Sequence, residues 1–255
     1  MQTMKRLSRT EWREHEDLSA MLFRVRGKAT ARQLRLFACA CVRRLWHLLL
    51  DERSRQALEM AEKFADGHVS QDQILAPLRS PAGVSGTVPS PSGNTAMQMA
   101  AREANSAANS CTYVFNVDAS VVRVTANHAS NALAWVEAAQ VPSWQLRSPR
   151  WRTGKAEAVR QQCGLLRDIV HPFRPRAVDP SWLQWDRGTI ARIARSIYDE
   201  GRFDDLPILA DALADAGCDD EVLIAHCRQA EPHVRGCWVL DLLLEKAAKV
   251  VRLGA

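Results

Sequence analysis

Four residues that can ligate a metal ion lie close together near the end of the sequence: His226, Cys227, His233 and Cys237. Imidazole nitrogens and thiolate sulfurs are the ligands that tetrahedral zinc sites prefer. If a last helix begins by His233, then His233, Cys237 and Asp241 follow one another at intervals of four along one stripe of that helix. The turn before it would bring His226 or Cys227 back toward the stripe. This pattern makes a zinc site stereochemically possible, but the signal is weak, so we expect no cofactor and keep zinc as the alternative.

The same residues allow two other interpretations. The spacing fits no standard zinc finger, so Cys237 could instead be a buried core residue, with His233 at a helix start or on the surface. A thiol activated by an imidazole is the other alternative, and His233 with Cys237 is better placed for it than the adjacent His226 and Cys227. No third residue that would orient the imidazole can be identified. We therefore expect no catalytic residue here.

A basic helix face is the second candidate binding site. At 100° per residue, a helix beginning at Ala31 places four cationic or titratable side chains opposite its apolar stripe: Arg32, Arg35, Arg43 and His47. Such a face could follow a phosphate backbone, and Trp144 and Trp151 lie in a second basic stretch where they could stack on bases. The plainer interpretation is a solvated helix face. No helix-turn-helix pattern supports DNA recognition.

The sequence contains none of the common catalytic motifs. A phosphate-binding loop, a dinucleotide-binding glycine turn, a zinc protease motif and a serine nucleophile elbow are all absent. The sequence thus leaves enzymatic activity undecided but favours its absence. We expect a non-catalytic interaction or scaffold protein that binds another protein through exposed Arg and Trp side chains. A nucleic-acid-associated basic protein is the first alternative, and a zinc-binding module is the second.

Composition and charge indicate an ordinary soluble protein. The chain has 255 residues, 47% hydrophobic and 25% charged, with a formal net charge of +5. Residues 1–55 and 143–195 each carry a net charge of +7, whereas residues 196–231 carry −8, so acidic and basic blocks could pair within one fold. Seven cysteines cannot all pair in disulfides, and no signal peptide or membrane-spanning segment is recognisable. We expect a cytoplasmic protein that does not contact a membrane.

Helical periodicity recurs along the chain, and strand signals are few. The pattern predicts an all-α fold, an irregular multi-helix bundle with Pro-rich connectors. We expect an N-terminal helical segment (1–79), a Pro/Gly/Ser linker (80–93), an Ala-rich helical segment (94–141) and a C-terminal helical segment (142–255) that shares one core with the first. The predicted helices cover residues 31–49, 51–67, 94–140 with a break near Asn116, 155–170, 189–200, 204–216, 219–228 and 233–250.

Two stretches carry a resemblance to known sequences. They are RQLRLFACACVRRLWHLLLDERSRQALEMAEKFADG (Arg32–Gly67) and the segments LLRDIVHPFRP and AHCRQAEPHVRGCWVLDLLLEK within Leu165–Lys246. Both resemble a family of uncharacterised proteins expanded in planctomycete bacteria, in which such segments flank an Ala-rich middle of variable length. The resemblance implies membership of that family and brings no activity, cofactor or partner with it.

Overall fold

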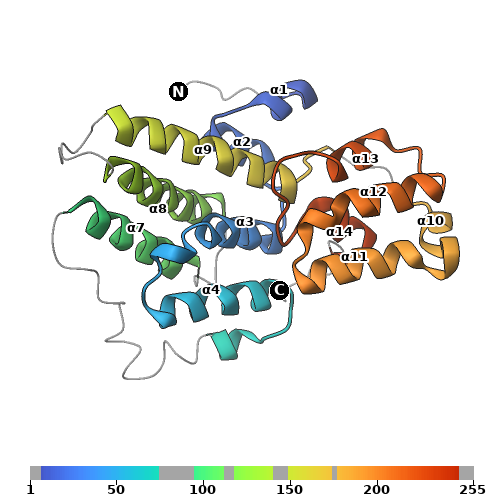
Figure 1. Ribbon diagram of the computed structural model, residues 1–255, viewed down its shortest axis with the longest axis horizontal. Helices are drawn as coiled ribbons and strands as arrows, with labels where there is room; N and C mark the ends of the chain where they lie inside the picture. Colours follow the sequence, from blue (N-terminus) through green and yellow to red (C-terminus); the bar gives the residue numbers. More distant parts are fainter. Residues whose placement is uncertain (1–6, 75–94, 112–117, 140–148, 174–176, 247–255) are drawn as a thin grey trace. The chain divides into compact units, whose positions relative to one another are not determined.

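The computed structural model describes residues 7–74, 95–111, 118–139, 149–173 and 177–246 (Figure 1). These residues form helices, turns and connecting segments and no strand, so the prediction of an all-α fold is confirmed. The chain divides into two compact units, Met1–Cys163 and Gly164–Ala255. Within the described residues, no helix combines the length and the apolar character that crossing a bilayer requires. The predicted linker at residues 80–93 lies outside the described residues.

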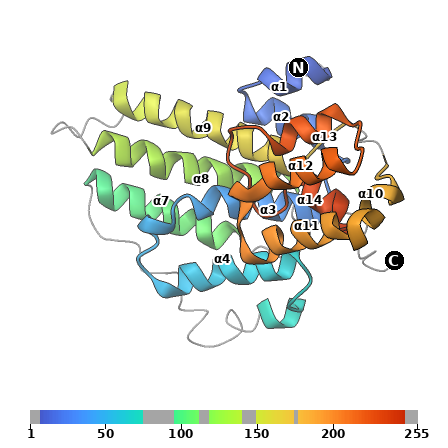
Figure 2. The same cartoon turned by 45° about the vertical axis from the view of Figure 1, so that its right-hand side comes forward.

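The N-terminal unit is built around α3. Its described helices are α1 (Arg9–Glu14), α2 (Leu18–Val25), α3 (Ala31–Arg43), α4 (Glu52–Ala65), α7 (Ala96–Cys111), α8 (Ala119–Ala138) and the first part of α9 (Pro149–Ile169). Helix α3 packs against α4, α7 and α8, and α7 lies along α8 (Figures 1 and 2). Small side chains such as Ala104, Ala108, Ala126 and Ala129 fill this interface and are fully buried. Their size lets the two helix backbones approach closely.

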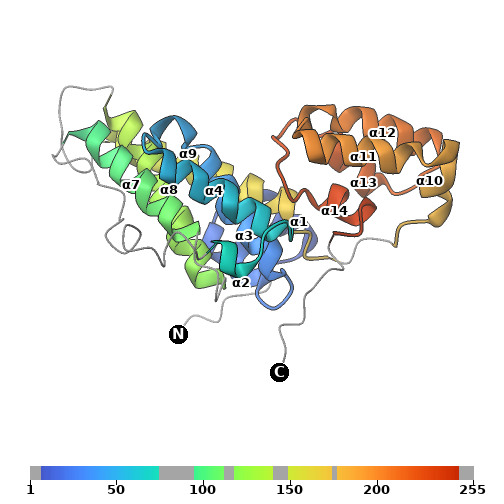
Figure 3. The ribbon, with the colours of Figure 1, turned by 90° about the horizontal axis from the view of Figure 1, so that it is seen from below.

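The C-terminal unit contains the end of α9 and five short helices. These are α10 (Pro180–Gln184), α11 (Thr189–Glu200), α12 (Leu206–Asp215), α13 (Glu221–Cys227) and α14 (Trp238–Leu243), seen from below in Figure 3. Helix α11 packs against α12 and α14, and α12 packs against α13. Their common core includes Ile197, Tyr198 and Leu213. Asp side chains accept backbone N–H groups at the starts of α10 and α13, which satisfies amides that a short helix leaves unpaired.

The boundaries of several helices differ from the prediction, and α9 begins at Pro149 where the prediction began at residue 155. The predicted helix over residues 31–49 ends at Arg43, and a 3₁₀ turn, Trp46–Leu48, follows it. The predicted last helix from His233 was wrong in its start, because α14 begins only at Trp238. Gly236 has a φ of 94°, a left-handed conformation that no α-helix can contain. This glycine therefore separates His233 from the helix on which the predicted stripe depended.

Candidate metal centre

Three segments of the C-terminal unit bring four potential metal ligands together. Asp168 lies near the end of α9, His226 lies in the last turn of α13, His233 lies in the turn that follows, and Cys237 caps the start of α14. One ligand atom from each residue lies within 4.8 Å of the other three. Helices α9, α13 and α14 thus meet at a single point through these side chains.

The distances within this cluster are close to those of a tetrahedral zinc site. Asp168 Oδ1 lies 2.6 Å from His233 Nδ1 and 3.1 Å from His226 Nε2. Cys237 Sγ lies 3.3 Å from His226 Nε2 and 3.9 Å from His233 Nδ1. With zinc bonds of 2.0–2.3 Å, neighbouring ligand atoms of a tetrahedron are about 3.3 to 3.6 Å apart. Shifts of up to about an ångström would therefore place all four atoms around one ion.

The ligand side chains are held in place and shielded from water. The Asp168 side chain is 1% exposed, and its second oxygen, Oδ2, accepts the backbone N–H of Val234 at 2.9 Å. Gln229 hydrogen-bonds to the His226 side chain, and the ring of Trp238 packs 4.9 Å from the His226 ring. Outer contacts of this kind fix the orientation of ligands at metal centres.

Burial and hydrogen bonding set the charges in this cluster. Burial alone would raise the pKa of Asp168, but hydrogen bonds from His226 and His233 outweigh it and lower the pKa below its usual value. Burial lowers the pKa of His226, although Asp168 opposes that shift. Burial also raises the pKa of the Cys237 thiol far above its usual value. In the absence of a metal the cluster thus contains a buried carboxylate, a neutral His226 and a protonated thiol.

A divalent cation would change this charge balance. Zn²⁺ bound by a carboxylate, a thiolate and two neutral imidazoles forms a complex without net charge. A neutral complex is much easier to bury than an isolated carboxylate. The donor set also suits zinc, since nitrogen, sulfur and carboxylate oxygen are all established zinc ligands.

The structure brings together three of the four residues that the spacing singled out. Cys227 is not among the ligands, because its side chain is buried in the apolar core of the unit, where burial raises its pKa to about 12. Asp168 takes the fourth position. Asp241, which the predicted helical stripe included, is buried but does not belong to the cluster.

Asp168 was missed because it lies 65 positions before His233 in the sequence. The sequence does contain a weak local signal for Asp168, because this residue lies within the apolar run LLRDIV. The apolar residues of that run are all buried: Leu165, Leu166, Ile169 and Val170. A charged residue among such neighbours needs a partner. Which partner it has depends on the folding of α9 against the later helices.

The predicted basic face of α3 is largely engaged within the N-terminal unit. Arg32 pairs with Asp66 at 2.8 Å, and Arg43 forms two hydrogen bonds with Glu62. The expectation that Arg35 faces solvent was wrong, since Arg35 is 6% exposed and its guanidinium lies 4.6 Å from the centre of the Phe64 ring. His47 is exposed. This face therefore presents fewer cationic groups than a helical wheel of α3 predicts.

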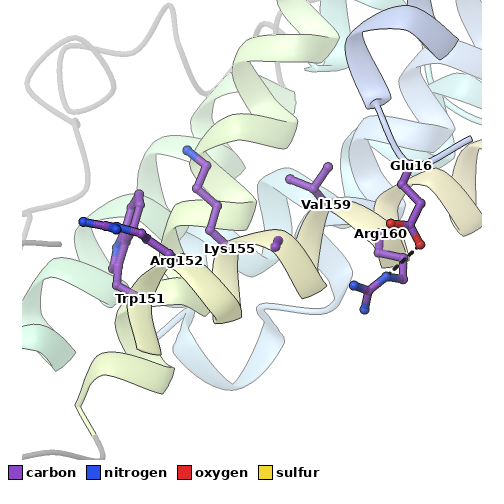
Figure 4. Close-up of a pocket in the computed structure, with 7 residues that line it drawn as sticks. Glu16, Trp151, Arg152, Lys155, Val159 and Arg160 are labelled. Carbon is purple, nitrogen blue, oxygen red and sulfur yellow. Dashed lines mark hydrogen bonds and ion pairs between the residues drawn. The ribbon is translucent and has the colours of Figure 1, made fainter. Parts of the chain in front are cut away.

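Trp151 and the second basic stretch line a shallow cavity of about 400 Å³ along α9 (Figure 4). The Trp151 ring packs edge-on against Trp135, and the ammonium of Lys155 lies 5.2 Å from its centre. Arg160 closes the other end of the cavity through an ion pair with Glu16 at 2.9 Å. Trp144, the other aromatic residue of that stretch, lies outside the described residues.

Comparison of the sequence with protein-family models, with curated proteins and with solved structures finds no significant match.

Proposed function

We propose that this protein is a helical zinc-binding protein whose C-terminal unit holds one Zn²⁺ ion through Asp168, His226, His233 and Cys237. The observation that carries this proposal is the convergence of four donor atoms of three chemical types within 4.8 Å. Two imidazole nitrogens approach the same carboxylate oxygen, and the thiol completes the group. A core built only for packing has no need of this combination.

The geometry favours a structural role for the ion over a catalytic one. Catalytic zinc sites use three protein ligands and leave the fourth position to water or substrate. Here four protein side chains occupy all four positions, and the Asp168 and Cys237 side chains are fully buried. A zinc ion that ties α9, α13 and α14 together supports the role of an interaction or scaffold protein in a reducing compartment such as the cytoplasm. None of the seven cysteines forms a disulfide, which is consistent with such a compartment.

Metal content together with cobalt spectroscopy tests this proposal. Protein purified without added metal should contain about one equivalent of zinc. Replacement of the zinc by Co²⁺ should give the visible absorption of tetrahedral cobalt and a sulfur-to-cobalt charge-transfer band. Cys237→Ala should abolish that band, because it removes the only thiolate ligand. Cys227→Ala is the matched control: it removes a neighbouring buried thiol outside the cluster, so the band and the zinc content should stay unchanged.

Two results would contradict the proposal. One is wild-type protein that contains less than about a tenth of an equivalent of zinc and takes up no added Zn²⁺ or Co²⁺ stoichiometrically. The other is a sulfur-to-cobalt band that disappears in Cys227→Ala and persists in Cys237→Ala.

A further inference from the structure

A second cavity, of about 550 Å³, lies in the N-terminal unit between α8, α9 and the end of α3. Its volume is within the range of small-molecule sites. Leu133 and Val136 of α8 give it an apolar wall, and Arg44, Glu137 and Glu157 place charges around that wall. At Gly154 the two long helices touch, since a Cβ atom there would lie 2.7 Å from Cγ of Glu137. This close approach places the apolar wall that Leu133 and Val136 form on α8 beside the Glu157 side chain of α9.

Arg44 lines this cavity, and its guanidinium forms no ion pair with any described residue. Its Nη1 atom is buried and has no hydrogen-bond partner among the described residues. Burial lowers the pKa of Arg44, and the charge of Glu157 opposes that shift only in part. A guanidinium N–H that is shielded from water and lacks an acceptor is unfavourable by more than an ordinary unmade hydrogen bond. Because the guanidinium has no ion-pair partner in the protein, it can pair with a carboxylate held in the cavity.

The other charges in the cavity restrict the kind of ligand. Glu157 already pairs with Arg160 and accepts a hydrogen bond from Gln161, whereas Glu137 is exposed and forms no ion pair with any described residue. Arg44 and Arg150 balance the carboxylates of Glu137 and Glu157, so the lining has no net charge and complements a zwitterion better than a doubly charged phosphate. A single carboxylate can form the paired hydrogen bonds that a guanidinium prefers, and an ammonium group on the same ligand would complement Glu137.

We propose that this cavity binds a small zwitterion of the amino-acid type, with its carboxylate on Arg44, its ammonium group toward Glu137 and an apolar side chain against Leu133 and Val136. The site is independent of the metal centre, because all its residues belong to the other compact unit. It needs no rearrangement of the helices, since the cavity is already present.

Amide NMR titrations with four probes test this proposal: leucine, isocaproate, isoamylamine and inorganic phosphate. Leucine should give saturable shifts in α8 and α9, isocaproate should bind more weakly, and isoamylamine and phosphate should not saturate. Arg44→Gln should weaken leucine binding about tenfold or more, because the charged donor is lost. Arg152→Gln, an exposed arginine in the shallow cavity along the same helix, is the matched control and should bind leucine within about twofold of wild type.

A second variant keeps the test decisive if Arg44→Gln does not fold. Glu137→Gln removes an exposed carboxylate, so it should weaken leucine binding and leave isocaproate binding unchanged. The proposal is overturned if neither leucine nor isocaproate saturates the wild-type protein. It is also overturned if Arg44→Gln binds leucine as wild type does, or if phosphate binds while the carboxylates do not.

Discussion

Asp168 makes the largest set of contacts in the metal centre. Its Oδ1 atom contacts His226 and His233, and its Oδ2 atom accepts the backbone N–H of Val234. One carboxylate thus serves as a ligand and also anchors the turn that carries another ligand. Loss of the charge and loss of the acceptor atoms should therefore have separate effects.

Two substitutions at Asp168 separate these effects. Asp168→Asn keeps an oxygen that can accept the Val234 N–H but removes the charge, so zinc affinity should fall by at least about tenfold. Asp168→Ala should lower zinc affinity too. With a chelator present, it should also lower the free energy of unfolding by about 1–3 kcal/mol relative to Asp168→Asn, because the Val234 N–H is left unpaired. Competition with a zinc indicator and denaturant unfolding measure the two quantities. Equal unfolding of both variants in chelator would contradict the anchoring role.

At the level of single residues, sequence spacing singled out three members of the Asp168, His226, His233 and Cys237 cluster and missed the fourth. His226, His233 and Cys237 lie within one short stretch, where local geometry limits the distances between them. Cys227 entered the predicted set because it adjoins His226, yet neighbouring residues on a helix point about 100° apart, and its side chain faces the core. Asp168 depends on a long-range contact that no local pattern encodes.

Several helices begin directly after an Asp side chain that accepts backbone N–H groups, and α8 is a clear case. Asp118 accepts the backbone N–H groups of Ser120 at 2.8 Å and Val121 at 3.1 Å, and also the Ser120 hydroxyl. These hydrogen bonds, that of the Ser120 hydroxyl first, lower the pKa of Asp118 below its usual value. The charged form of this side chain is therefore the form that the folded state favours.

The effect of this cap should depend on pH. Because the pKa in the folded state lies below that in the unfolded state, the stabilisation is complete above the unfolded value of about 3.9 and is lost as pH falls through the folded value. Asp118→Ala should reduce the free energy of unfolding by about 1 kcal/mol at neutral pH, and this difference should shrink in acid. Asp118→Asn retains an acceptor and should show a smaller loss. Thermal unfolding of the three proteins at several pH values measures this, and a deficit for Asp118→Ala that grows in acid would contradict it.

Helix ends were predictable where a glycine takes a left-handed conformation. Gly67 and Gly217 were expected to close helices, and both have positive φ values, of 75° and 80°. The start of α14 was not predictable by the same reasoning, because the apolar period continues through Gly236 and gives no sign that the backbone turns there. A periodic pattern shows which face of a helix is buried, but it does not show where a turn interrupts that helix.

On the scale of the whole molecule, the fold class could be predicted from the sequence, whereas the expected segments stay a prediction beside the two compact units of the structure. The expected boundary before residue 142 followed a change in composition, whereas the two units divide at residues 163 and 164, inside α9. A continuous helix carries no compositional mark of such a division. The expected pairing of acidic and basic blocks is also partly local, since Arg202–Asp205 and Arg228–Asp211 both lie within the acidic block.

Removal of the metal should affect only one of the two units. A ligand that binds only the folded state stabilises it by about 2.7 kcal/mol at a free concentration a hundred times its Kd. Addition of a strong chelator should therefore lower hydrogen-exchange protection by up to about a hundredfold in α11 to α14. Protection in α3, α4, α7 and α8 should not change. Cys237→Ala should show no response to the chelator, whereas an equal loss of protection in both units would contradict a metal centre confined to residues 164–255.

The indole of Trp238 lies between two imidazole rings, 4.6 Å from that of His171 and 4.9 Å from that of His226. An excited indole is quenched by a nearby protonated imidazole and responds to the field of a neighbouring cation. If the site binds zinc, the emission of Trp238, one of eight tryptophans in the chain, should change when the metal is added or removed.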